Sequence, residues 1–507
     1  MDRPNIIYIL ADDMGYGDVS YFNEKAAFKT PNFDKMCENG ISFTDAHASS
    51  SVCTPSRYSI LTGRYNWRSN LKEGVLFGYD TPLIEDVRTT VASYLKDKGY
   101  KTACIGKWHL GFEWMLKNPS DKESIDFTKE LINTPIDHGF DYFYGIAGSL
   151  DMPPYVYVEN RSVTALPNRE EGCETFTSNE LSCQAYNKAF FRKGPTGADF
   201  VHEETLPNFT DRVLNQIEKY QDDPFFIYFP LTAPHTPILP TKEFQGKSGT
   251  NEYGDFVLMC DDIVGKIQNK LDELGIADNT IVIYTSDNGC SPMANFPELA
   301  QYGHNPSYIY RGHKADIYEG GHRIPLIVTW PNSIRPGIQS HEPVCLCDLF
   351  ATVADLMGDT LEDNTAEDSV SNLPIWLEQN GAEPVREALV HHSINGSFSI
   401  RKGKWKLEMC PDSGGWSAPT PQSTPVDNPN GDSSNNRQID ENAIQLYDLD
   451  EDVRERFNVS HLYPEVVNEL RNLLIKYIVE GRSTKGAPQL NTGDDRWKQI
   501  EWIDEFI

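Results

Sequence analysis

Four short apolar runs stand out in the first two-thirds of the sequence: NIIYIL (5–10), TACIG (102–106), FFIYF (225–229) and TIVIYT (280–285). Each run is followed by ionisable or strongly polar residues: Asp12 and Asp13, Lys107 and His109, His235, and Asp287 and Asn288. Carboxylate and amide oxygens are ligands that Ca²⁺ and Mg²⁺ prefer. Two adjacent aspartates remain ionised together only when a cation or hydrogen-bond donors compensate them. An Asp-Asp pair alone is common on protein surfaces. Asp12 and Asp13 together with Asp287 and Asn288, which follow another apolar run, predict a divalent cation site.

A cysteine, Cys53, begins a second candidate site in the segment SSVCTPSRYSILTGR (50–64). Pro55 suits the first turn of a helix and Gly63 its end. Cys53 then lies at a helix N-terminus, where backbone N–H groups favour an anion. Arg57 lies one turn further along the same face and can contact a tetrahedral oxyanion with two N–H groups. In isolation, the same position also suits a buried inert cysteine or a thiolate nucleophile.

The elements that must position these residues indicate an α/β fold. The four runs are rich in β-branched and aromatic residues without polar alternation, as in strands buried on both faces of a parallel sheet. Helical segments at 90–99 and 252–275 lie between them. In open parallel sheets the site lies beyond the carboxyl ends of the strands. We therefore expect a mainly parallel sheet flanked by helices, with all four polar groups at one edge.

The sequence becomes acidic and polar near residue 360, as in a connecting segment. We therefore predict two domains, 1–374 and 375–507. Four strand-like segments follow, at 387–393, 397–403, 404–410 and 444–450, and their spacing predicts an antiparallel sheet. A helix is expected over 463–481, with Val466, Leu470, Leu473 and Tyr477 on its apolar face. The smaller domain is therefore expected to be α+β.

Composition limits the classes of partner. The 507 residues carry a formal net charge of −30, which argues against a broad surface for nucleic acid or an anionic membrane. A small anionic group in a local basic pocket stays compatible with that charge. No stretch is long and apolar enough to cross a bilayer. The sequence opens MDRPNIIYIL without a secretory signal, so export would require a signal absent from this sequence.

At Cys53 the sequence resembles the type I sulfatases, whose signature is C-x-P-S-R followed by x₄-T-G-R. CTPSRYSILTGR (53–64) matches this pattern. The resemblance extends over most of the chain, through ADDMGYGD (11–18), GKWHLG (106–111), PHTP (234–237), TSDNG (285–289), GHKADIYEGGHRIPLIVTWP (312–331), RKGKWKL (401–407) and LYDLDED (446–452). It implies an alkaline-phosphatase-like catalytic domain and a smaller C-terminal domain that completes the substrate pocket.

The resemblance also implies a role for each residue. Asp12, Asp13, Asp287 and Asn288 would hold one divalent cation, Ca²⁺ rather than Mg²⁺. Cys53 would be converted by a formylglycine-generating maturation enzyme to formylglycine, which acts as the nucleophile and contacts the metal. Arg57 would stabilise the hydrated aldehyde, and the sulfate site would be lined by Lys107, His109, His235 and Lys314.

The chemistry of sulfate ester hydrolysis suits these residue types. Positive charge from the cation, Arg57 and the two lysines would stabilise the transferring sulfuryl group. One hydroxyl of the formylglycine gem-diol would attack sulfur, with Asp287 as the expected base. His235, assisted by Lys314, would protonate the leaving alcohol, and His109 would act as the base when sulfate is expelled.

The substrate is expected to be a sulfated saccharide, because the chain is similar to bacterial carbohydrate sulfatases. Some of these sulfatases act on 6-O-sulfated galactose or N-acetylgalactosamine, so the resemblance implies a 6-O-sulfatase on such residues. The acidic surface favours an exo-acting pocket over a long groove. Candidate sugar contacts, which are equally compatible with loop packing, are Asp151, Tyr155, His304, Arg311, His391, His392 and Trp405. Alternatives are a formylglycine-dependent phosphonate or phosphodiester hydrolase and an inert protein that binds sulfated glycans. Because sulfated glycans are extracellular, a periplasmic or secreted location is expected.

Overall fold

The four apolar runs form the middle of a large sheet. In the computed structural model, which describes residues 3–173, 191–379, 381, 384–421, 444–494 and 496–506, they become β1 (Asn5–Ala11), β4 (Lys101–Lys107), β10 (Phe225–Pro230) and β11 (Thr280–Ser286). The order β11-β1-β10-β4 is parallel throughout. Ile7 of β1, for example, lies between Ile227 of β10 and Val282 of β11. The prediction of a parallel central sheet is confirmed.

Six more strands extend this sheet to ten, in the order β13-β2-β12-β11-β1-β10-β4-β5-β6-β7. They are β2 (Ile41–Phe43), β5 (Tyr142–Ile146), β6 (Val158–Glu159), β7 (Ser162–Val163), β12 (Leu326–Thr329) and β13 (Ile338–Ser340). Antiparallel pairing occurs only toward the edges of the sheet, at β12 and β6. Two small sheets pair β3 (Ala46–His47) with β14 (Val344–Cys345) and β8 (Pro167–Glu171) with β9 (Gly194–Gly197).

Helices cover both faces of the large sheet. One face carries α1 (Pro31–Asn39), α4 (Thr205–Tyr220) and α5 (Glu252–Glu273), and the other carries α2 (Cys53–Thr62), α3 (Val91–Asp97), α8 (Leu349–Leu356) and α9 (Leu373–Trp376). Successive residues of β1 point to opposite faces. Ile7 and Ile9 therefore pack in the first core and Ile6 and Tyr8 in the second. Two short helices, α6 (Phe296–Gln301) and α7 (Glu319–His322), lie between β11 and β12.

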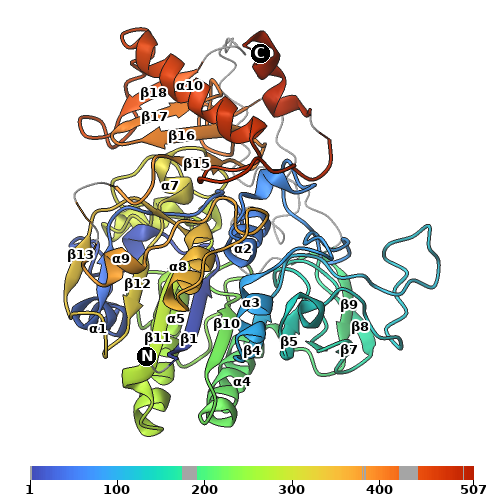
Figure 1. Ribbon diagram of the computed structural model, residues 1–507. Coiled ribbons are helices and arrows are strands. Elements are labelled where there is room, and N and C mark those ends of the chain that lie inside the picture. The colour runs from blue at the N-terminus through green and yellow to red at the C-terminus, as the bar shows by residue number, and fades with distance from the viewer. Residues whose placement is uncertain are drawn as a thin grey trace.

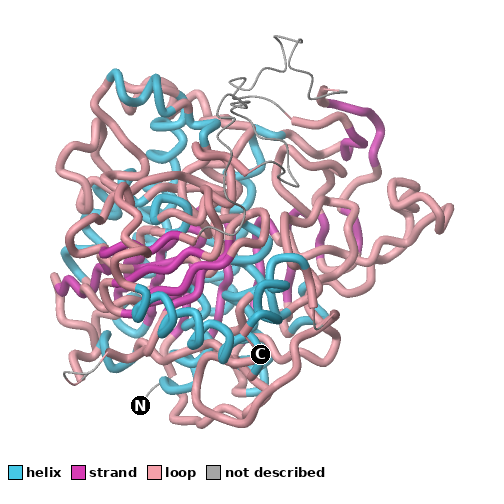
Figure 2. Tube along the Cα trace, turned by 90° about the horizontal axis from the view of Figure 1, so that it is seen from above, coloured by secondary structure: helices cyan, strands magenta, loops and turns pink. Residues whose placement is uncertain are grey.

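A smaller unit follows, made of β15 (Leu389–His392), β16 (Phe398–Lys402), β17 (Trp405–Glu408), β18 (Gln445–Asp448) and α10 (Pro464–Val479). Its four strands are antiparallel, as predicted. In Figure 1 this unit lies above the large sheet, at the end where α2 and α7 are found, and Figure 2 shows it from above. The buried face of α10 differs from the prediction, because Val467 and Leu474 are buried where Val466 and Leu473 are only half-buried.

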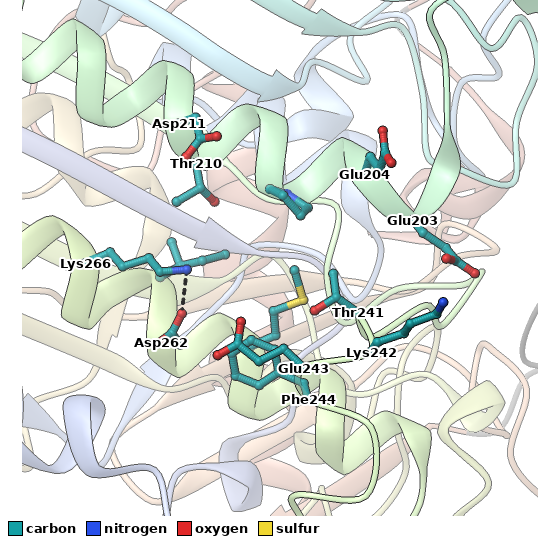
Figure 3. A pocket seen from close by; sticks show the side chains of 13 residues that line it. Glu203, Glu204, Thr210, Asp211, Thr241, Lys242, Glu243, Phe244, Asp262 and Lys266 are labelled. Atoms are coloured by element: carbon teal, nitrogen blue, oxygen red, sulfur yellow. Dashed lines mark ion pairs between the residues drawn. The ribbon is translucent and has the colours of Figure 1, made fainter.

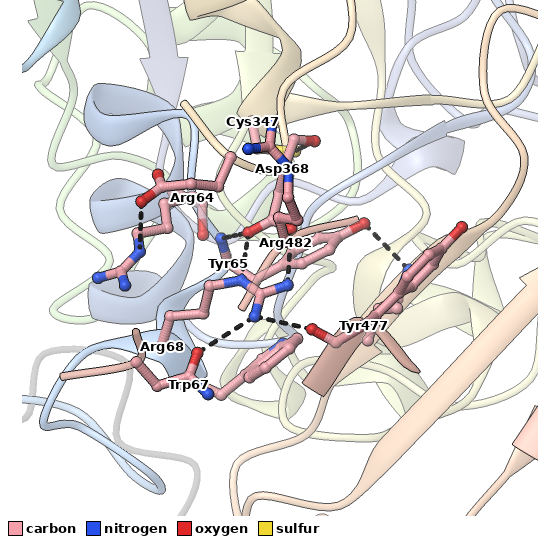
Figure 4. A network of polar contacts seen from close by, with 12 residues as sticks. Arg64, Tyr65, Trp67, Arg68, Cys347, Asp368, Tyr477 and Arg482 are labelled. Atoms are coloured by element: carbon pink, nitrogen blue, oxygen red, sulfur yellow. Dashed lines mark hydrogen bonds and ion pairs between the residues drawn. The ribbon is translucent and has the colours of Figure 1, made fainter. Parts of the chain in front are cut away.

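A polar network joins the two units (Figure 4). The buried carboxylate of Asp368 accepts hydrogen bonds from Arg68 Nε at 2.7 Å and Nη2 at 2.8 Å, and from the backbone N–H of Tyr65 at 2.8 Å. Arg68 Nη1 also donates to the backbone oxygen of Tyr477 in α10, at 3.0 Å. The segment after α2 is thereby fixed to α10. The division of the chain at residues 374 and 375 stays a prediction.

Candidate functional site

The polar residues that follow the parallel strands meet at one edge of the large sheet. Lys107, the last residue of β4, donates from Nζ to both oxygens of Asp12, at 2.9 and 2.8 Å. The side-chain N–H of Asn288 donates to Asp13 Oδ1 at 2.8 Å, and the backbone N–H of Asp13 donates to Asp287 Oδ1 at 3.2 Å. The strand ends of β1, β4 and β11 therefore share one buried polar cluster.

Each carboxylate of the cluster is paired with a positively charged side chain. Asp12 pairs with Lys107, as given above. Asp13 Oδ2 accepts from Lys314 Nζ at 2.7 Å. Asp287 Oδ2 accepts from Arg57 Nε at 3.0 Å and from Arg57 Nη2 at 2.6 Å. All six side chains are buried, and charges buried in this way require partners.

The same charges control protonation in the cluster. Burial by itself would raise the pKa of Asp12, but Lys107, His235, Arg57 and Lys314 together hold it well below its usual range. Burial raises the pKa of Asp287 to about 6, with Arg57 opposing this effect and Asp12 adding to it. Asp12 and Asp287 therefore differ in environment although they belong to the same cluster.

The donor atoms of this cluster fit a hard divalent cation. Three carboxylates and one amide supply only oxygen ligands, which suits Ca²⁺ or Mg²⁺. Among the described residues, the buried amide oxygen of Asn288, Oδ1, has no hydrogen-bond partner, so it is available as a ligand. Ligand atoms of Asp12, Asp287 and Cys53 all lie within 4.8 Å of one another.

Cys53 is the first residue of α2 and is buried, with 1% of its surface exposed. Pro55 lies in the first turn of the helix, and Gly63 ends it in the left-handed conformation, with φ of 65°. Burial raises the pKa of the Cys53 thiol, although Lys107 and Lys314 oppose this effect. An unmodified thiol is therefore held neutral and would be a weak nucleophile.

Two histidines flank the cluster. His109 donates from Nε2 to the backbone oxygen of Leu76 at 2.7 Å, because a carbonyl oxygen can only accept. Its Nδ1 is then an unprotonated acceptor, buried and without a partner within the described ranges. Burial lowers the pKa of His109 well below its usual range, and Lys107 and Arg57 add to this effect. His235 Nε2 lies 3.5 Å from Asp13 Oδ2, and its Nδ1 donates to the backbone oxygen of Thr236 at 2.6 Å.

Two of the candidate sugar contacts lie beside this cluster. Asp151 Oδ1 is 4.0 Å from His235 Nδ1, while Asp151 Oδ2 accepts from Arg192 Nη1 at 2.7 Å. Asp151 Oδ1 is a buried oxygen with no hydrogen bond in the described part of the chain. Tyr155 is buried and donates from its hydroxyl to the backbone oxygen of Arg192. Arg192 was not found by sequence reasoning, because no motif surrounds it.

Three other candidates have partners elsewhere. His304 is buried and its Nε2 lies 2.8 Å from Asp18 Oδ1. Arg311 donates to the backbone oxygen of Glu455 at 2.6 Å, and its guanidinium lies over the ring of Tyr318. Trp405 is half-buried and packs against Tyr463. The structure does not bring these three side chains to the carboxylate cluster.

His391 and His392 lie in β15, between the two units. His391 belongs to a buried group with His47 and His322, in which the Nδ1 atoms of His47 and His322 are 2.9 Å apart. The rings of His322 and His391 stack with centroids 3.8 Å apart and 11° between their planes. The ring-nitrogen lone pairs of His322 and His391 therefore lie in nearly parallel planes and do not converge on one metal ion. Ring stacking and hydrogen bonds account for this group better than a metal site does. His392 contacts the Asn66 side chain.

A separate cavity of about 530 Å³ lies between α4 and α5 (Figure 3). Figure 3 shows Glu203, Glu204 and Asp211 at its walls and Lys266 paired with Asp262. None of the residues of the carboxylate cluster line it. Its mainly acidic lining suits an anionic group less well than the strand-end cluster, which contains Arg57, Lys107 and Lys314. Among the described residues no helix has both the length and the apolar character needed to cross a membrane.

Comparisons with known proteins agree on one family. The model of the family named Sulfatase matches residues 4–359. N-acetylgalactosamine-6-O-sulfatase of Bacteroides thetaiotaomicron is 34% identical over 499 residues, which cover 93% of this chain and 92% of that protein. Human arylsulfatase A is 30% identical over 515 residues, covering 98% and 92%. A solved structure, described as concerning the metabolism of multiple glycosaminoglycans by Bacteroides thetaiotaomicron, has a TM-score of 0.80 at 32% identity and covers 94% of this chain and 99% of its own.

Proposed function

Because the chain belongs to the sulfatase family, we propose that it removes a 6-O-sulfate from a galactose or N-acetylgalactosamine type residue at the end of a glycan. It is a sulfuric ester hydrolase with the alkaline-phosphatase-like fold of that family. The 6-O position and the sugar are supported by the relative that is 34% identical and is named N-acetylgalactosamine-6-O-sulfatase.

One observation carries the proposal: Cys53 lies at a helix N-terminus beside three carboxylates and three buried cations. Lys107 and Lys314 both influence the titration of Cys53, so positive charge lies close to the nucleophile position. A sulfate ester repels an incoming nucleophile through its oxygens. Fixed positive charge around the sulfuryl group removes this obstacle and stabilises charge in the transition state.

Sulfatases use formylglycine, formed from the signature cysteine, and a divalent metal. In this chain the modified residue would be Cys53, and its hydrate would supply the attacking hydroxyl. Asp12, Asp13, Asp287 and Asn288 would hold the metal. Every donor is an oxygen, which suits Ca²⁺ or Mg²⁺, and we propose Ca²⁺ because the resemblance to the sulfatases favours it. A bound cation would supply Lewis acidity at the sulfate oxygens. Arg57, held by Asp287 and by the backbone oxygen of Lys107, would orient the hydrate.

Two histidines would move protons on opposite sides of the reaction. His235 is fixed through Nδ1–H, with Nε2 turned toward Asp13, and would protonate the departing sugar alcohol with Lys314 assisting. His109 keeps a buried, unprotonated Nδ1, and this nitrogen would accept a proton when sulfate leaves. A lowered pKa keeps His109 neutral over a wide range of pH.

We propose that Asp151 and Tyr155 form the sugar side of the site, with the unit 375–507 completing the pocket. Asp151 Oδ1, which accepts no hydrogen bond from the described residues, is suited to accept one from a sugar hydroxyl. An exo-acting pocket agrees with the net charge of −30, which opposes a long polyanion on the surface. A periplasmic or secreted location and a formylglycine-generating maturation enzyme as partner belong to the same proposal.

Mass spectrometry of the peptide that contains residue 53, combined with a substrate panel, tests this function. The chain is co-produced with a maturation enzyme, with Cys53→Ala as the matched control. The panel contains 6-O-sulfo and 4-O-sulfo forms of galactose and N-acetylgalactosamine, together with a phosphonate monoester. We expect a formylglycine mass and sulfate release from the 6-O-sulfo sugars, both lost in Cys53→Ala. Faster cleavage of the phosphonate, or a modified residue 53 with no release from any substrate, would refute the proposal.

A further inference from the structure

Asp316, two residues after Lys314, joins two segments of backbone that are about 100 residues apart. It is fully buried, and its Oδ1 accepts hydrogen bonds from the backbone N–H groups of Trp416, at 2.7 Å, and Ser417, at 3.0 Å. Its Oδ2 accepts from the backbone N–H of His313 at 2.9 Å. A buried carboxylate that accepts N–H bonds from two distant segments holds those segments in a fixed position relative to each other. Here Asp316 connects the lysine loop to the smaller unit.

The loop that carries Lys314 has no regular secondary structure to hold it. Its backbone is instead fixed on both sides: Ala315 N–H donates to Ser51 O at 2.8 Å, and Ile317 N–H donates to Ser413 O at 2.7 Å. Ala315 adopts a φ of +80°, which is unfavourable for a residue with a Cβ atom and needs support from its surroundings. The position of the Lys314 ammonium therefore depends on contacts made by its neighbours.

Gly415 shows how closely the smaller unit approaches this loop. A Cβ atom at Gly415 would lie 2.4 Å from Ala315 O and 2.6 Å from Asp316 Oδ1. The adjacent Trp416 packs in one apolar cluster with Val52 and Ala315, the residues beside Cys53 and Lys314. The segment 413–417 thus contacts both the residue before Cys53 and the loop that carries Lys314.

We propose that Asp316 is a positioning residue for the sulfatase reaction, which places the Lys314 ammonium against Asp13 by tying the lysine loop to segment 413–417. This inference rests on the proposed function, in which Lys314 assists departure of the sugar alcohol. The smaller unit thereby contributes to catalysis through the backbone of its segment 413–417.

A double-mutant cycle on 6-O-sulfo-N-acetylgalactosamine tests the inference, using matured enzyme and the variants Asp316→Asn, Lys314→Met and the double variant. Asparagine keeps the size of aspartate but places an N–H group against one of the three backbone donors. We expect kcat to fall roughly 10- to 100-fold in Asp316→Asn, with KM changed less than threefold, because misplacement of a catalytic group acts mainly on the chemical step. In the Lys314→Met background the same change should cost less than threefold, since the ammonium it positions is already gone.

Asp261→Asn is the matched control. Asp261 is also buried and accepts backbone N–H bonds from Asn32 and Phe33, but it lies in α5 and binds the first turn of α1. It should lower the melting temperature while kcat stays within threefold of wild type. An equal loss of kcat in Asp261→Asn, or a full loss from Asp316→Asn in the Lys314→Met background, would overturn the inference. Normal kcat in Lys314→Met would instead overturn the role of Lys314 in the proposed function. If Asp316→Asn does not fold, Gly415→Ala replaces it in the same cycle and carries the same expectations.

Discussion

Arg57 donates two hydrogen bonds to a single oxygen of Asp287, at 3.0 and 2.6 Å, although the residues are 230 positions apart in the sequence. A third N–H group of Arg57 donates to the backbone oxygen of Lys107 at 2.9 Å. The guanidinium thus connects the helix that begins at Cys53 with the ends of β4 and β11. A movement of Arg57 or Asp287 would therefore disturb the helix that begins at Cys53, the proposed metal ligands or both.

Replacing Arg57 by lysine should lower kcat/KM roughly 100- to 1,000-fold. An ammonium keeps the charge but cannot donate in three fixed directions. Sulfate release from 6-O-sulfo-N-acetylgalactosamine measures the effect. Arg335→Lys is the control, because Arg335 makes a similar two-pronged contact with Glu378 at the surface. A loss below tenfold in Arg57→Lys would contradict the role assigned to the guanidinium.

Removal of the proposed Ca²⁺ should destabilise the protein, because an ion held by oxygen ligands of the folded state stabilises that state. We expect the melting temperature to fall in a chelator and to recover with added Ca²⁺, since a ligand at 100 times its Kd stabilises by about 2.7 kcal/mol. Asn288→Leu should reduce this calcium-dependent shift by at least half. Asn372→Leu, which removes another buried and unpartnered amide oxygen among the described residues, should keep the full shift. An unchanged shift in Asn288→Leu would remove Asn288 from the ligand set.

Asp151→Asn should raise KM for 6-O-sulfo-N-acetylgalactosamine roughly tenfold, because a hydrogen bond to a charged acceptor contributes about 1.5 kcal/mol or more. Its effect on kcat should be smaller than on KM, since Asp151 is proposed to contact the sugar and not the sulfate. Steady-state kinetics separate the two constants. Asp452→Asn provides a control, because Asp452 is buried in the smaller unit and its Oδ1 accepts no hydrogen bond from the described residues, with Arg456 Nε 3.5 Å away. A fall in kcat at constant KM would place Asp151 in the chemistry instead.

Stability should fall as the pH falls from about 6.5 toward 4. Burial lowers the pKa of His47 to about 4, with Arg323 adding to the effect, and burial lowers the pKa of His391 well below its usual range, with His322 adding to it. Histidine in an unfolded chain titrates near 6.5. In this window the unfolded chain therefore binds protons that the folded chain does not, and each such histidine reduces stability by about 1.4 kcal/mol per pH unit.

His391→Phe isolates one of these contributions. Phenylalanine keeps an aromatic ring stacked on His322 but removes the titrating group. Urea unfolding between pH 7.5 and 5 should show a shallower loss of stability than wild type, by about one proton's contribution. The exposed His461, changed to Phe, should leave the wild-type slope unchanged. Equal slopes in wild type and His391→Phe would show that this ring is protonated in the folded protein.

The central sheet and the carboxylate cluster were predictable because both depend on local patterns. Runs of β-branched and aromatic residues identify strands buried on both faces, and parallel strands bring their carboxyl ends together whatever the loops do. Asp12, Lys107 and Asp287 could therefore be placed at one edge before their contacts were known. The pairing of each positively charged side chain with its carboxylate depends on side-chain rotamers and on the paths of the loops. It cannot be predicted from the spacing of residues in the sequence.

Residues whose role comes from long-range packing were beyond sequence reasoning. His304 resembles a polar loop residue in sequence, yet it is buried against Asp18, 286 positions away. Val466 and Val467 are adjacent β-branched residues, and only the packing of α10 on the small sheet decides which one is buried. Asp316 lies inside a motif, but two of the three backbone N–H groups that it holds, those of Trp416 and Ser417, come about 100 residues later.

The pairing of three carboxylates with three cations makes the cluster nearly neutral by itself. A divalent cation would then give the pocket a positive potential inside a molecule whose formal net charge is −30. An approaching polyanion meets repulsion at distances comparable to the Debye length, about 10 Å at 0.1 M salt, and attraction only at the pocket. Added salt should therefore weaken the repulsion by the acidic surface more than the attraction at the site, because the repulsion acts over longer distances. Long sulfated chains should then reach the site more easily. Small sulfated sugars should lose part of their attraction to it.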